Sequence, residues 1–279
     1  MSLPSQQPAE VYSAWLEQVV ADLEGAALER VLRAARQLKQ AHEASDDEPL
    51  LLATRAVGDS LDAMDLGLLG KPGWLSRVTG RASVAVREFT AQYDQVLTCT
   101  AQLAAAAAAS DRRDAACTAG AARPQLELEM ESRAWRETLM RAGQRMDALS
   151  QLVARAEPSE QAERNAGQLP ARLKHLEPIA QAARQVLELR LEAAAARELL
   201  GELLQGEWGR SLATWKEKFK AVVDALERLG PQGAPAGDVL RTHKELRRLA
   251  HRVYASCSHL LQQQEMAMQG LAALCGEDR

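Results

Sequence analysis

The chain has 279 residues, a formal net charge of -4, 47% hydrophobic residues and only 4% aromatic residues. This composition supplies a large core, and the slightly acidic balance argues against a protein shaped to bind polyanions. No apolar run approaches the roughly 20 residues of a membrane-spanning helix, and the start MSLPSQQPAE lacks the pattern of a secretory signal. We therefore expect a cytoplasmic protein, and the abundance of alanine, leucine, arginine and glutamate is typical of long helices.

The N-terminal part of the chain predicts three helical segments. Apolar periodicity favours helices over residues 8–44 and 49–66, joined by the acidic stretch SDDEP, in which Asp46, Asp47 and Glu48 are expected to form a solvated turn. Glycine and proline in GLLGKPGW, residues 67–74, end the second helix. A third helix is expected over residues 74–110, with a bend at Gly80.

The Gly-Lys pair in GLLGKPGW raises the question of a phosphate-binding loop. A Walker loop needs four residues between its glycines and a Ser or Thr after the lysine. Here only two residues separate Gly67 from Gly70, and Lys71 is followed by Pro72, which has neither a hydroxyl nor a backbone N–H. The stretch therefore predicts a turn between helices.

The middle of the chain predicts a fourth helix with a heptad pattern. The stretch DAACTAGAARP, residues 114–124, is expected to interrupt the preceding helix, and a new helix covers residues 125–156. Its apolar residues recur with spacings of three, four and seven, which indicates a coiled-coil stripe. These residues are Leu128, Trp135, Leu139, Ala142, Met146, Leu149 and Val153. The polar stretch EPSEQAERNAGQLP, residues 157–170, predicts a loop.

The last third of the chain predicts two further long helical regions. A helix runs over residues 171–204, and the two glycines of QGEWGRS, residues 205–211, indicate a break or kink. A stripe from Trp208 to Leu229 follows, and GPQGAPAG, residues 230–237, stops the chain before a final striped helix over residues 238–274.

These patterns predict an all-α fold, namely an elongated antiparallel bundle or coiled coil of long helices. Residues 1–110 would form N-terminal helices with a Gly/Pro break at 67–73, and residues 111–279 a long-helix coiled-coil bundle. We expect both parts to form one continuous elongated unit.

No catalytic, metal or cofactor site is predicted from the titratable residues. The four cysteines, at 99, 117, 257 and 275, contain no CxxC pair, and they are expected to be small buried hydrophobes. His243, His251 and His259 recur every eight residues, which turns each one about 80° from the last on a helix. They are expected to be solvated or interhelical.

Several segments resemble the toxic anion resistance family, whose TelA-like members are associated with tellurite resistance. LATWKEKFKAVVDAL, residues 212–226, resembles the family's tryptophan-bearing helix, and ARQVLELRLEAAAARELLGELL, residues 183–204, resembles the long helix before it. GDVLRTHKELRRLAHRV, residues 237–253, is similar to the segment that leads into the family's terminal helix, and the break at 67–81 followed by REFTAQYDQV is similar to its glycine-rich turn and aromatic helix. The resemblance implies a cytoplasmic all-helical protein and carries no catalytic residues.

Two groups of residues are candidates for partner binding. Trp208 and Trp215 lie seven residues apart and so share a helix face, either as core residues or as anchors for a partner. The most basic stretch could contact an acidic protein partner or form a plain solvated face, and it lacks the interleaved aromatic residues of a nucleic-acid site. It contains Arg241, Lys244, Arg247, Arg248 and Arg252.

The leading hypothesis is a non-enzymatic helical interaction protein of the toxic anion resistance type, which acts in stress or envelope-stress tolerance through protein partners. The alternative is a coiled-coil structural or scaffold component of a bacterial assembly such as a secretion or phage system. No cofactor and no nucleic acid is expected, and self-association and peripheral membrane contact stay open.

Overall fold

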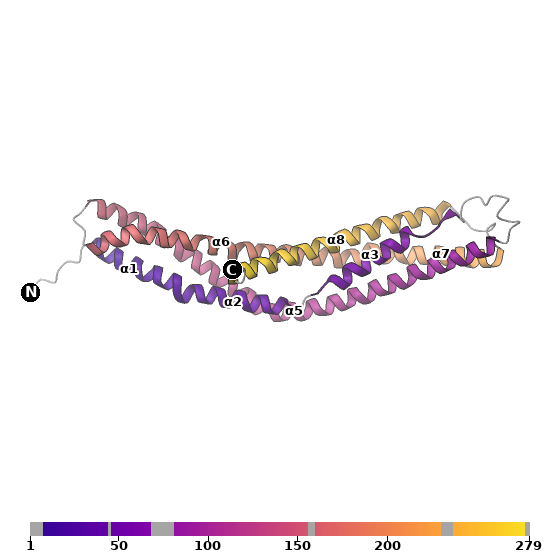
Figure 1. Ribbon diagram of the computed structural model, residues 1–279, viewed down its shortest axis with the longest axis horizontal. Coiled ribbons are helices and arrows are strands. Elements are labelled where there is room, and N and C mark those ends of the chain that lie inside the picture. Colours follow the sequence, from indigo (N-terminus) through magenta and orange to yellow (C-terminus); the bar gives the residue numbers. More distant parts are fainter. Residues whose placement is uncertain (1–7, 44–45, 68–80, 156–159, 230–236, 277–279) are drawn as a thin grey trace, which may run out of the picture. The chain divides into compact units, whose positions relative to one another are not determined.

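The computed structural model describes residues 8–43, 46–67, 81–155, 160–229 and 237–276, and within these ranges the chain forms helices and no strand. The predicted all-α bundle of long helices is confirmed (Figure 1). No helix in the described ranges is both long enough and apolar enough to cross a lipid bilayer. The elements are α1 (Pro8–Asp22), η1 (Leu23–Ala27), α2 (Leu28–His42), α3 (Glu48–Asp62), α5 (Arg81–Arg155), α6 (Glu160–Leu203), η3 (Leu204–Trp208), α7 (Gly209–Leu229) and α8 (Gly237–Cys275).

The chain divides into two compact units that are not continuous in sequence. Unit 1 contains Met1–Ala44, Ala116–Leu191 and Gln264–Arg279, and unit 2 contains Ser45–Ala115 and Glu192–Gln263. The predicted grouping into residues 1–110 and 111–279 differs from this division. The physical reason is that α5, α6 and α8 each contribute one stretch to unit 1 and another to unit 2.

The predicted interruption at residues 114–124 is wrong, because α5 is helical from Arg81 to Arg155. Cys117 and Ala121 within this stretch are buried in step with Leu128, so the apolar stripe crosses the supposed break. Pro124 removes one backbone hydrogen bond from the helix. Burial of the surrounding apolar residues outweighs that local cost.

The predicted loop at residues 157–170 is also wrong over most of its length, since α6 begins at Glu160. Ala162 and Leu169 are buried in the core of unit 1. The buried amide of Asn165 donates from Nδ2 to the Ser13 hydroxyl at 2.7 Å and to a Glu17 carboxylate oxygen at 3.2 Å. A polar sequence thus forms a helix because its few apolar residues are buried in the core of unit 1 and Asn165 bonds to α1.

The glycines that predicted a break or kink at 205–211 coincide with a π turn, η3, that joins α6 to α7. A second π turn, η1, lies between α1 and α2, within a stretch that was expected to be regular helix. A π turn inserts an extra residue into the helical path, so it shifts the register of the apolar stripe without ending the helix. The predicted Gly/Pro break at 67–73 lies outside the described residues apart from Gly67, and so do the predicted bend at Gly80 and residues 230–236 of the glycine- and proline-rich stretch.

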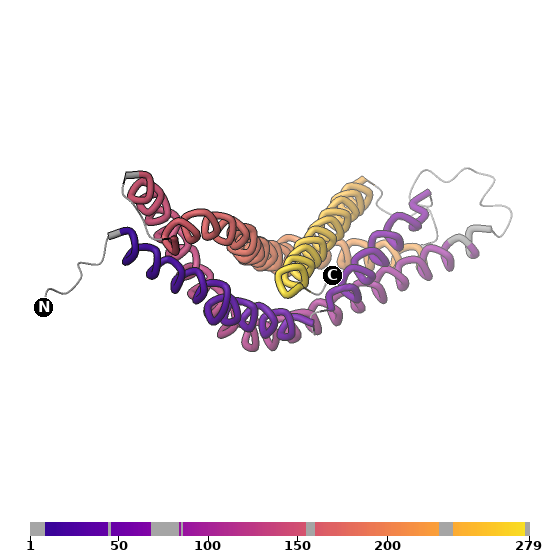
Figure 2. Tube along the Cα trace, turned by 60° about the vertical axis from the view of Figure 1, so that its left-hand side comes forward, coloured from indigo at the N-terminus to yellow at the C-terminus, as the bar shows by residue number. Residues whose placement is uncertain are grey.

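In unit 1, α1 and α2 run beside α5 and α6 (Figure 1 and Figure 2). Successive bonds join Ser13 to Asn165, Glu24 to Arg172 and His42 to Arg190, so α1 and α2 run parallel to α6 at a nearly constant offset. Arg30 pairs with Glu131 on α5 at 2.9 Å, and Ala41 approaches Gly120. Because the residue numbers of the α5 partners fall as those of α2 rise, these two helices are antiparallel.

The core of unit 1 is largely aliphatic. The stripe predicted on α5 supplies buried Leu128, Trp135, Ala142, Met146 and Leu149, as expected. The end of α8 packs closely on α6, since a Cβ atom at Gly270 would lie 2.8 Å from Val186 Cγ2. Glycine is therefore required at this crossing for steric reasons.

The core of unit 2 contains a cluster of aromatic rings. Trp215 lies at its centre, with its ring centroid 4.3 Å from that of Phe219 and 5.6 Å from that of Tyr93. The ring of Phe89 stacks on that of Phe219 with a centroid distance of 6.1 Å. The stripes predicted on α7 and on the unit 2 part of α8 form this core, which includes Phe219, Val222, Leu226, Leu246, Leu249, Val253, Cys257 and Leu260.

Candidate functional site

The two tryptophans predicted as core residues or partner anchors are both buried in unit 2. Trp215 has 0% of its surface exposed, and Trp208 is nearly as enclosed. The indole Nε1 of Trp215 donates to Nδ1 of His243 at 3.4 Å. Burial of this kind favours the core interpretation, because neither indole is presented on the surface.

His243 is an interhelical residue, as one of the sequence interpretations expected. Its Nε2 lies 3.2 Å from the carbonyl oxygen of Leu61, while its Nδ1 accepts from Trp215. Burial lowers the pKa of His243, against the opposing effect of the Leu61 carbonyl. The neutral Nε2–H tautomer satisfies both bonds, so this imidazole ties α3, α7 and α8 together.

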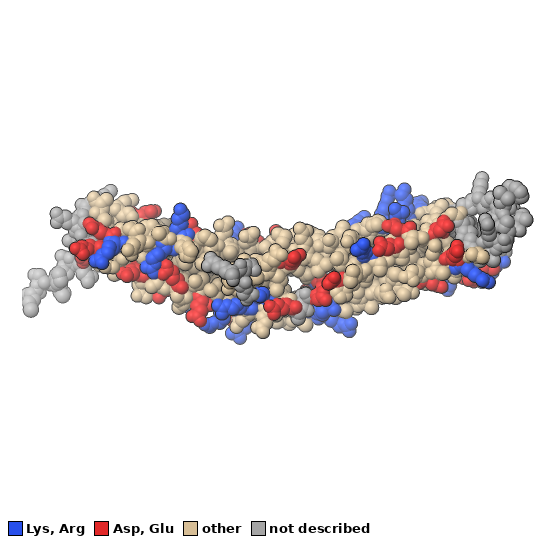
Figure 3. Space-filling view, in the orientation of Figure 1, with Lys and Arg blue, Asp and Glu red and all other residues tan. Residues whose placement is uncertain are grey.

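The basic stretch predicted on α8 is exposed but largely paired within unit 2. Figure 3 shows Lys and Arg side chains gathered over the first half of α8, interspersed with carboxylates. Arg247 pairs with Asp62 at 2.6 Å and Arg252 with Glu207 at 2.7 Å, while Arg241 pairs with Asp238. Of the five predicted basic residues, only Lys244 and Arg248 have no ion-pair partner in the described part of the chain.

Asp47 departs most clearly from expectation, because it is buried, whereas Asp46 and Glu48 of the predicted solvated turn are exposed. Only 2% of Asp47 is exposed, and it pairs with Arg197 on α6. The Ser110 hydroxyl donates to Asp47 Oδ1 at 2.5 Å and accepts from Arg197 Nη1 at 2.9 Å. Arg197 also pairs with Asp114 at 2.9 Å, and burial raises the pKa of Asp114 against the opposing charge of Arg197.

Sequence reasoning missed this network because its members are far apart in the chain. A signal was present in Arg197, a charged residue that directly follows the apolar run AAAA at residues 193–196. A buried guanidinium needs carboxylate partners, since an unpaired buried charge is strongly unfavourable. The network holds α3, α5 and α6 together in unit 2 and acts as a structural clamp.

Unit 1 contains a half-buried cation, Arg190, whose hydrogen bonds in the described residues reach no carboxylate. Arg190 donates from Nη1 to His42 Nε2 at 2.7 Å and from Nη2 to Gln125 Oε1 at 3.1 Å, and its Nε has no partner in the described residues. His42 Nδ1 lies 3.2 Å from the Leu38 carbonyl oxygen. Burial lowers the pKa of Arg190 to about 10 and that of His42 to about 4, the latter with help from the Arg190 charge.

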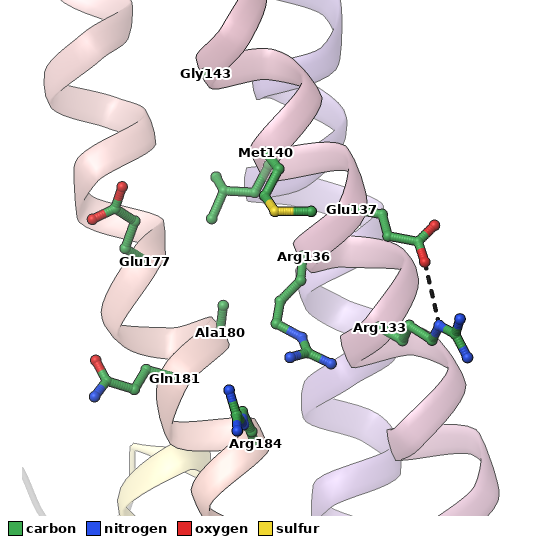
Figure 4. A pocket seen from close by; sticks show the side chains of 10 residues that line it. Arg133, Arg136, Glu137, Met140, Gly143, Glu177, Ala180, Gln181 and Arg184 are labelled. Carbon is green, nitrogen blue, oxygen red and sulfur yellow. Dashed lines mark hydrogen bonds and ion pairs between the residues drawn. The ribbon is translucent and has the colours of Figure 1, made fainter.

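A groove of about 580 Å³ lies between α5 and α6 on the surface of unit 1. Its residues are Arg133, Arg136, Glu137, Leu139, Met140 and Gly143 from α5, and Glu177, Ala180, Gln181 and Arg184 from α6. Figure 4 shows the Arg136 and Arg184 side chains pointing into the space between the helices, while Arg133 turns away with Glu137. The groove therefore combines cationic groups with an apolar lining.

The two arginines that point into the groove differ in their bonding. Arg184 Nε donates to Glu188 Oε1 at 2.7 Å, which occupies one of its five N–H groups. Arg136 has no hydrogen-bond or ion-pair partner in the described ranges, and its Nε is buried. An unpaired, partly buried guanidinium is unusual, because burial of a cation without an acceptor costs free energy.

Three exposed apolar residues lie on one side of the α5–α6 pair, and Met130 belongs to them because it follows Leu126 by about one helical turn. The Arg190–Gln125 bond brings the helices into contact, and the next residue on each is Leu191 and Leu126. Because the helices are antiparallel, one step forward on each turns both side chains to the same side. Leu126, Met130 and Leu191 are 56%, 62% and 62% exposed, and we call these three residues the outer apolar face.

The cysteines of the described residues form no disulfide bond. Cys99, Cys117 and Cys257 are buried free thiols, and burial raises the pKa of Cys257 to about 12. Within the described residues, no three His, Cys, Asp or Glu side chains gather as a metal site would require. Lys71 lies outside the described residues.

Comparison with known proteins gives no relative from which a function could be transferred. A scan of protein-family models, a search of curated proteins and a search of solved structures each find no match to this chain. The function proposed below therefore rests on the side chains of this chain.

Proposed function

We propose that this protein is a non-enzymatic helical interaction protein of the toxic anion resistance type. In this proposal it acts in the cytoplasm, in stress or envelope-stress tolerance, and a partner protein binds the outer apolar face of unit 1. The observation that carries the proposal is the exposure of Leu126, Met130 and Leu191 on one side of α5 and α6. Single exposed apolar residues are ordinary, but a group on one face is typical of a protein-binding surface.

A binding role also agrees with the state of the described nucleophiles. The Cys257 thiol, with its pKa raised to about 12, is protonated at neutral pH and therefore a poor nucleophile. Two groups with shifted pKa values, Asp114 and His243, are engaged in structural bonds within unit 2. Their pKa shifts are explained by packing and require no catalytic task.

The basic stretch of α8 contributes less to the proposal than the outer apolar face. Arg241, Arg247 and Arg252 already have carboxylate partners, so an acidic protein would have to compete with Asp238, Asp62 and Glu207. Lys244 and Arg248 remain for a peripheral contact, which would be screened by salt. We place the main contact on unit 1 for this reason.

Site-specific photocrosslinking in the native cell tests the proposal. A photoreactive residue at Met130 should give a discrete adduct with another protein, while the same residue at Leu52, which is similarly exposed on α3, should not. Leu126→Asp combined with Met130→Asp should remove the adduct and lower survival on tellurite, and Leu52→Asp should do neither. Adducts made only with a second copy would instead favour the scaffold alternative, and equal adducts at both positions would contradict the proposal.

A further inference from the structure

We propose that the groove between α5 and α6 in unit 1 binds a small amphiphilic monocarboxylate. Arg136 and Arg184 hold the carboxylate, and the apolar body lies along Leu139 and Met140. The proposal concerns a small-molecule ligand and goes beyond the docking of a partner protein on the outer apolar face.

The preference for an anion follows from the two guanidinium groups. Arg136 comes from α5 and Arg184 from α6, and both point into the same space (Figure 4). Two like charges on facing helices repel each other, and an oxyanion between them removes that repulsion. A carboxylate can accept parallel N–H bonds from a guanidinium, and such charge-assisted pairs are stronger and more specific than neutral hydrogen bonds.

The preference for a single negative charge follows from the other groove residues. Glu177 lines the same groove as Arg136 and Arg184. Glu137 is turned away with Arg133, and Glu188 already holds Arg184 Nε. A dianionic head group would meet these carboxylates as well as the arginines. A monocarboxylate gains the two guanidinium contacts with less repulsion, so it should bind better than a phosphate monoester of the same chain length.

The preference for an apolar body follows from the size and lining of the groove. Leu139, Met140, Gly143 and Ala180 extend from the arginines along the helices. The seven residue steps from Arg136 to Gly143 span about 10 Å of helix, which suits an alkyl chain of medium length or a ring system. The volume of about 580 Å³ is typical of ligand sites, which occupy roughly 300–1,000 Å³.

The experiment is a titration of the intact protein with decanoate, followed by NMR of ¹³C-methyl-labelled methionines. Met140 lines the groove, so its methyl resonance should shift with saturation, while the exposed Met130 outside the groove should move little. Decanol and decylammonium should give no saturable shift, and decyl phosphate should bind more weakly than decanoate. Equal affinity for decanoate and decanol would overturn the proposal.

Variants identify the head-group site. Arg136→Met and Arg184→Met should each weaken decanoate binding about ten-fold or more, because a charge-assisted hydrogen bond is lost. Arg164→Met removes an exposed arginine from α6 outside the groove and should leave the affinity unchanged. Circular dichroism and thermal unfolding confirm that each variant is folded. The assignment is wrong if folded Arg136→Met and Arg184→Met bind decanoate as tightly as the parent protein.

Discussion

The cores of units 1 and 2 are built from different kinds of residues, and their arginines have different partners. Unit 2 stacks Trp215 on Phe219 and Tyr93, and it pairs the buried Arg197 with Asp47 and Asp114. Unit 1 has a mainly aliphatic core, and its half-buried Arg190 contacts a neutral imidazole and an amide.

The contrast extends to the surface of the two units. In unit 1, Arg136 has no partner in the described residues, and Leu126, Met130 and Leu191 are exposed on one side of α5 and α6. In unit 2, the predicted partner-binding tryptophans are buried and most of the predicted arginines are paired. The difference teaches that residues which look functional in sequence can be structural, while the groups left unsatisfied by folding mark the candidate binding surface.

The largest effect that tests this comparison is expected from the removal of one buried tryptophan from each unit. Trp215→Ala should lower the free energy of unfolding by about 3–5 kcal/mol. Trp135→Ala, in unit 1, should cost less, since the Trp135 indole N–H has no partner in the described residues and each aromatic pair contributes about 0.5–1.5 kcal/mol beyond burial. Thermal unfolding and peptide-resolved hydrogen exchange measure both effects, and an equal or larger loss for Trp135→Ala would break the comparison.

The same tryptophan variants distinguish core from anchor. If Trp215 is a core residue, its replacement should lower melting temperature and cellular abundance together. A folded Trp215→Ala protein with normal stability and lost function would restore the anchor interpretation. Activity in cells must therefore be compared with the unfolding temperature of the purified variant.

The second test concerns the buried charges of unit 2. Arg197→Met leaves Asp47 and Asp114 without their cation, and removal of one partner from a buried ion pair costs about 3–5 kcal/mol. Arg197→Met combined with Asp47→Asn should recover part of this loss, because one orphaned charge is removed as well. Urea unfolding of the single and double variants measures the coupling, and additive losses would show that the network is not a unit.

A smaller effect is expected at the crossing of α8 and α6 in unit 1. Gly270→Ala places a Cβ atom 2.8 Å from Val186 Cγ2, and overpacking of this kind costs about 1–3 kcal/mol. Val186→Ala in the same protein should relieve the clash. Hydrogen exchange near the end of α8 should rise in the single variant and return in the double variant; no rise would mean that α6 and α8 can separate without cost.

The smallest predicted effect is a pH dependence from His42 in unit 1. Its pKa of about 4 in the folded protein lies below the value of about 6.5 expected when unfolded. The unfolded chain therefore binds more protons between these values, and stability should fall as the pH falls from about 6.5 to 4. Because His42 keeps some contact with solvent, we expect a loss of about 1–2 kcal/mol.

His42→Gln provides the control for this pH effect. The glutamine amide oxygen can accept from Arg190 in place of the imidazole, but it does not titrate. The variant should therefore have a flatter stability profile between pH 6.5 and 4, while the contribution of His243 in unit 2 persists in both proteins. Parallel profiles for parent and variant would contradict the assignment.

The sequence by itself determined the helical fold and most of the buried residues. The spacing of Leu128, Trp135 and Leu149 on α5, and of Trp215, Phe219 and Val222 on α7, places each set on one face. Burial follows from that periodicity because a helix must cover its apolar stripe. The stripes carried enough information to predict the core of each unit.

Only the tertiary structure decided which apolar helix stripes pack against each other and in which register. Asp47 is buried because Arg197, on a distant part of the chain, lies against it, and residues 114–124 stay helical because Ala121 is buried in the core of unit 1. The groove also depends on how α5 and α6 are aligned, since Arg136 and Arg184 line one groove only in this antiparallel register of the two helices. Local spacing fixes which face of a helix is apolar, whereas partner and register depend on packing between segments that are remote in sequence.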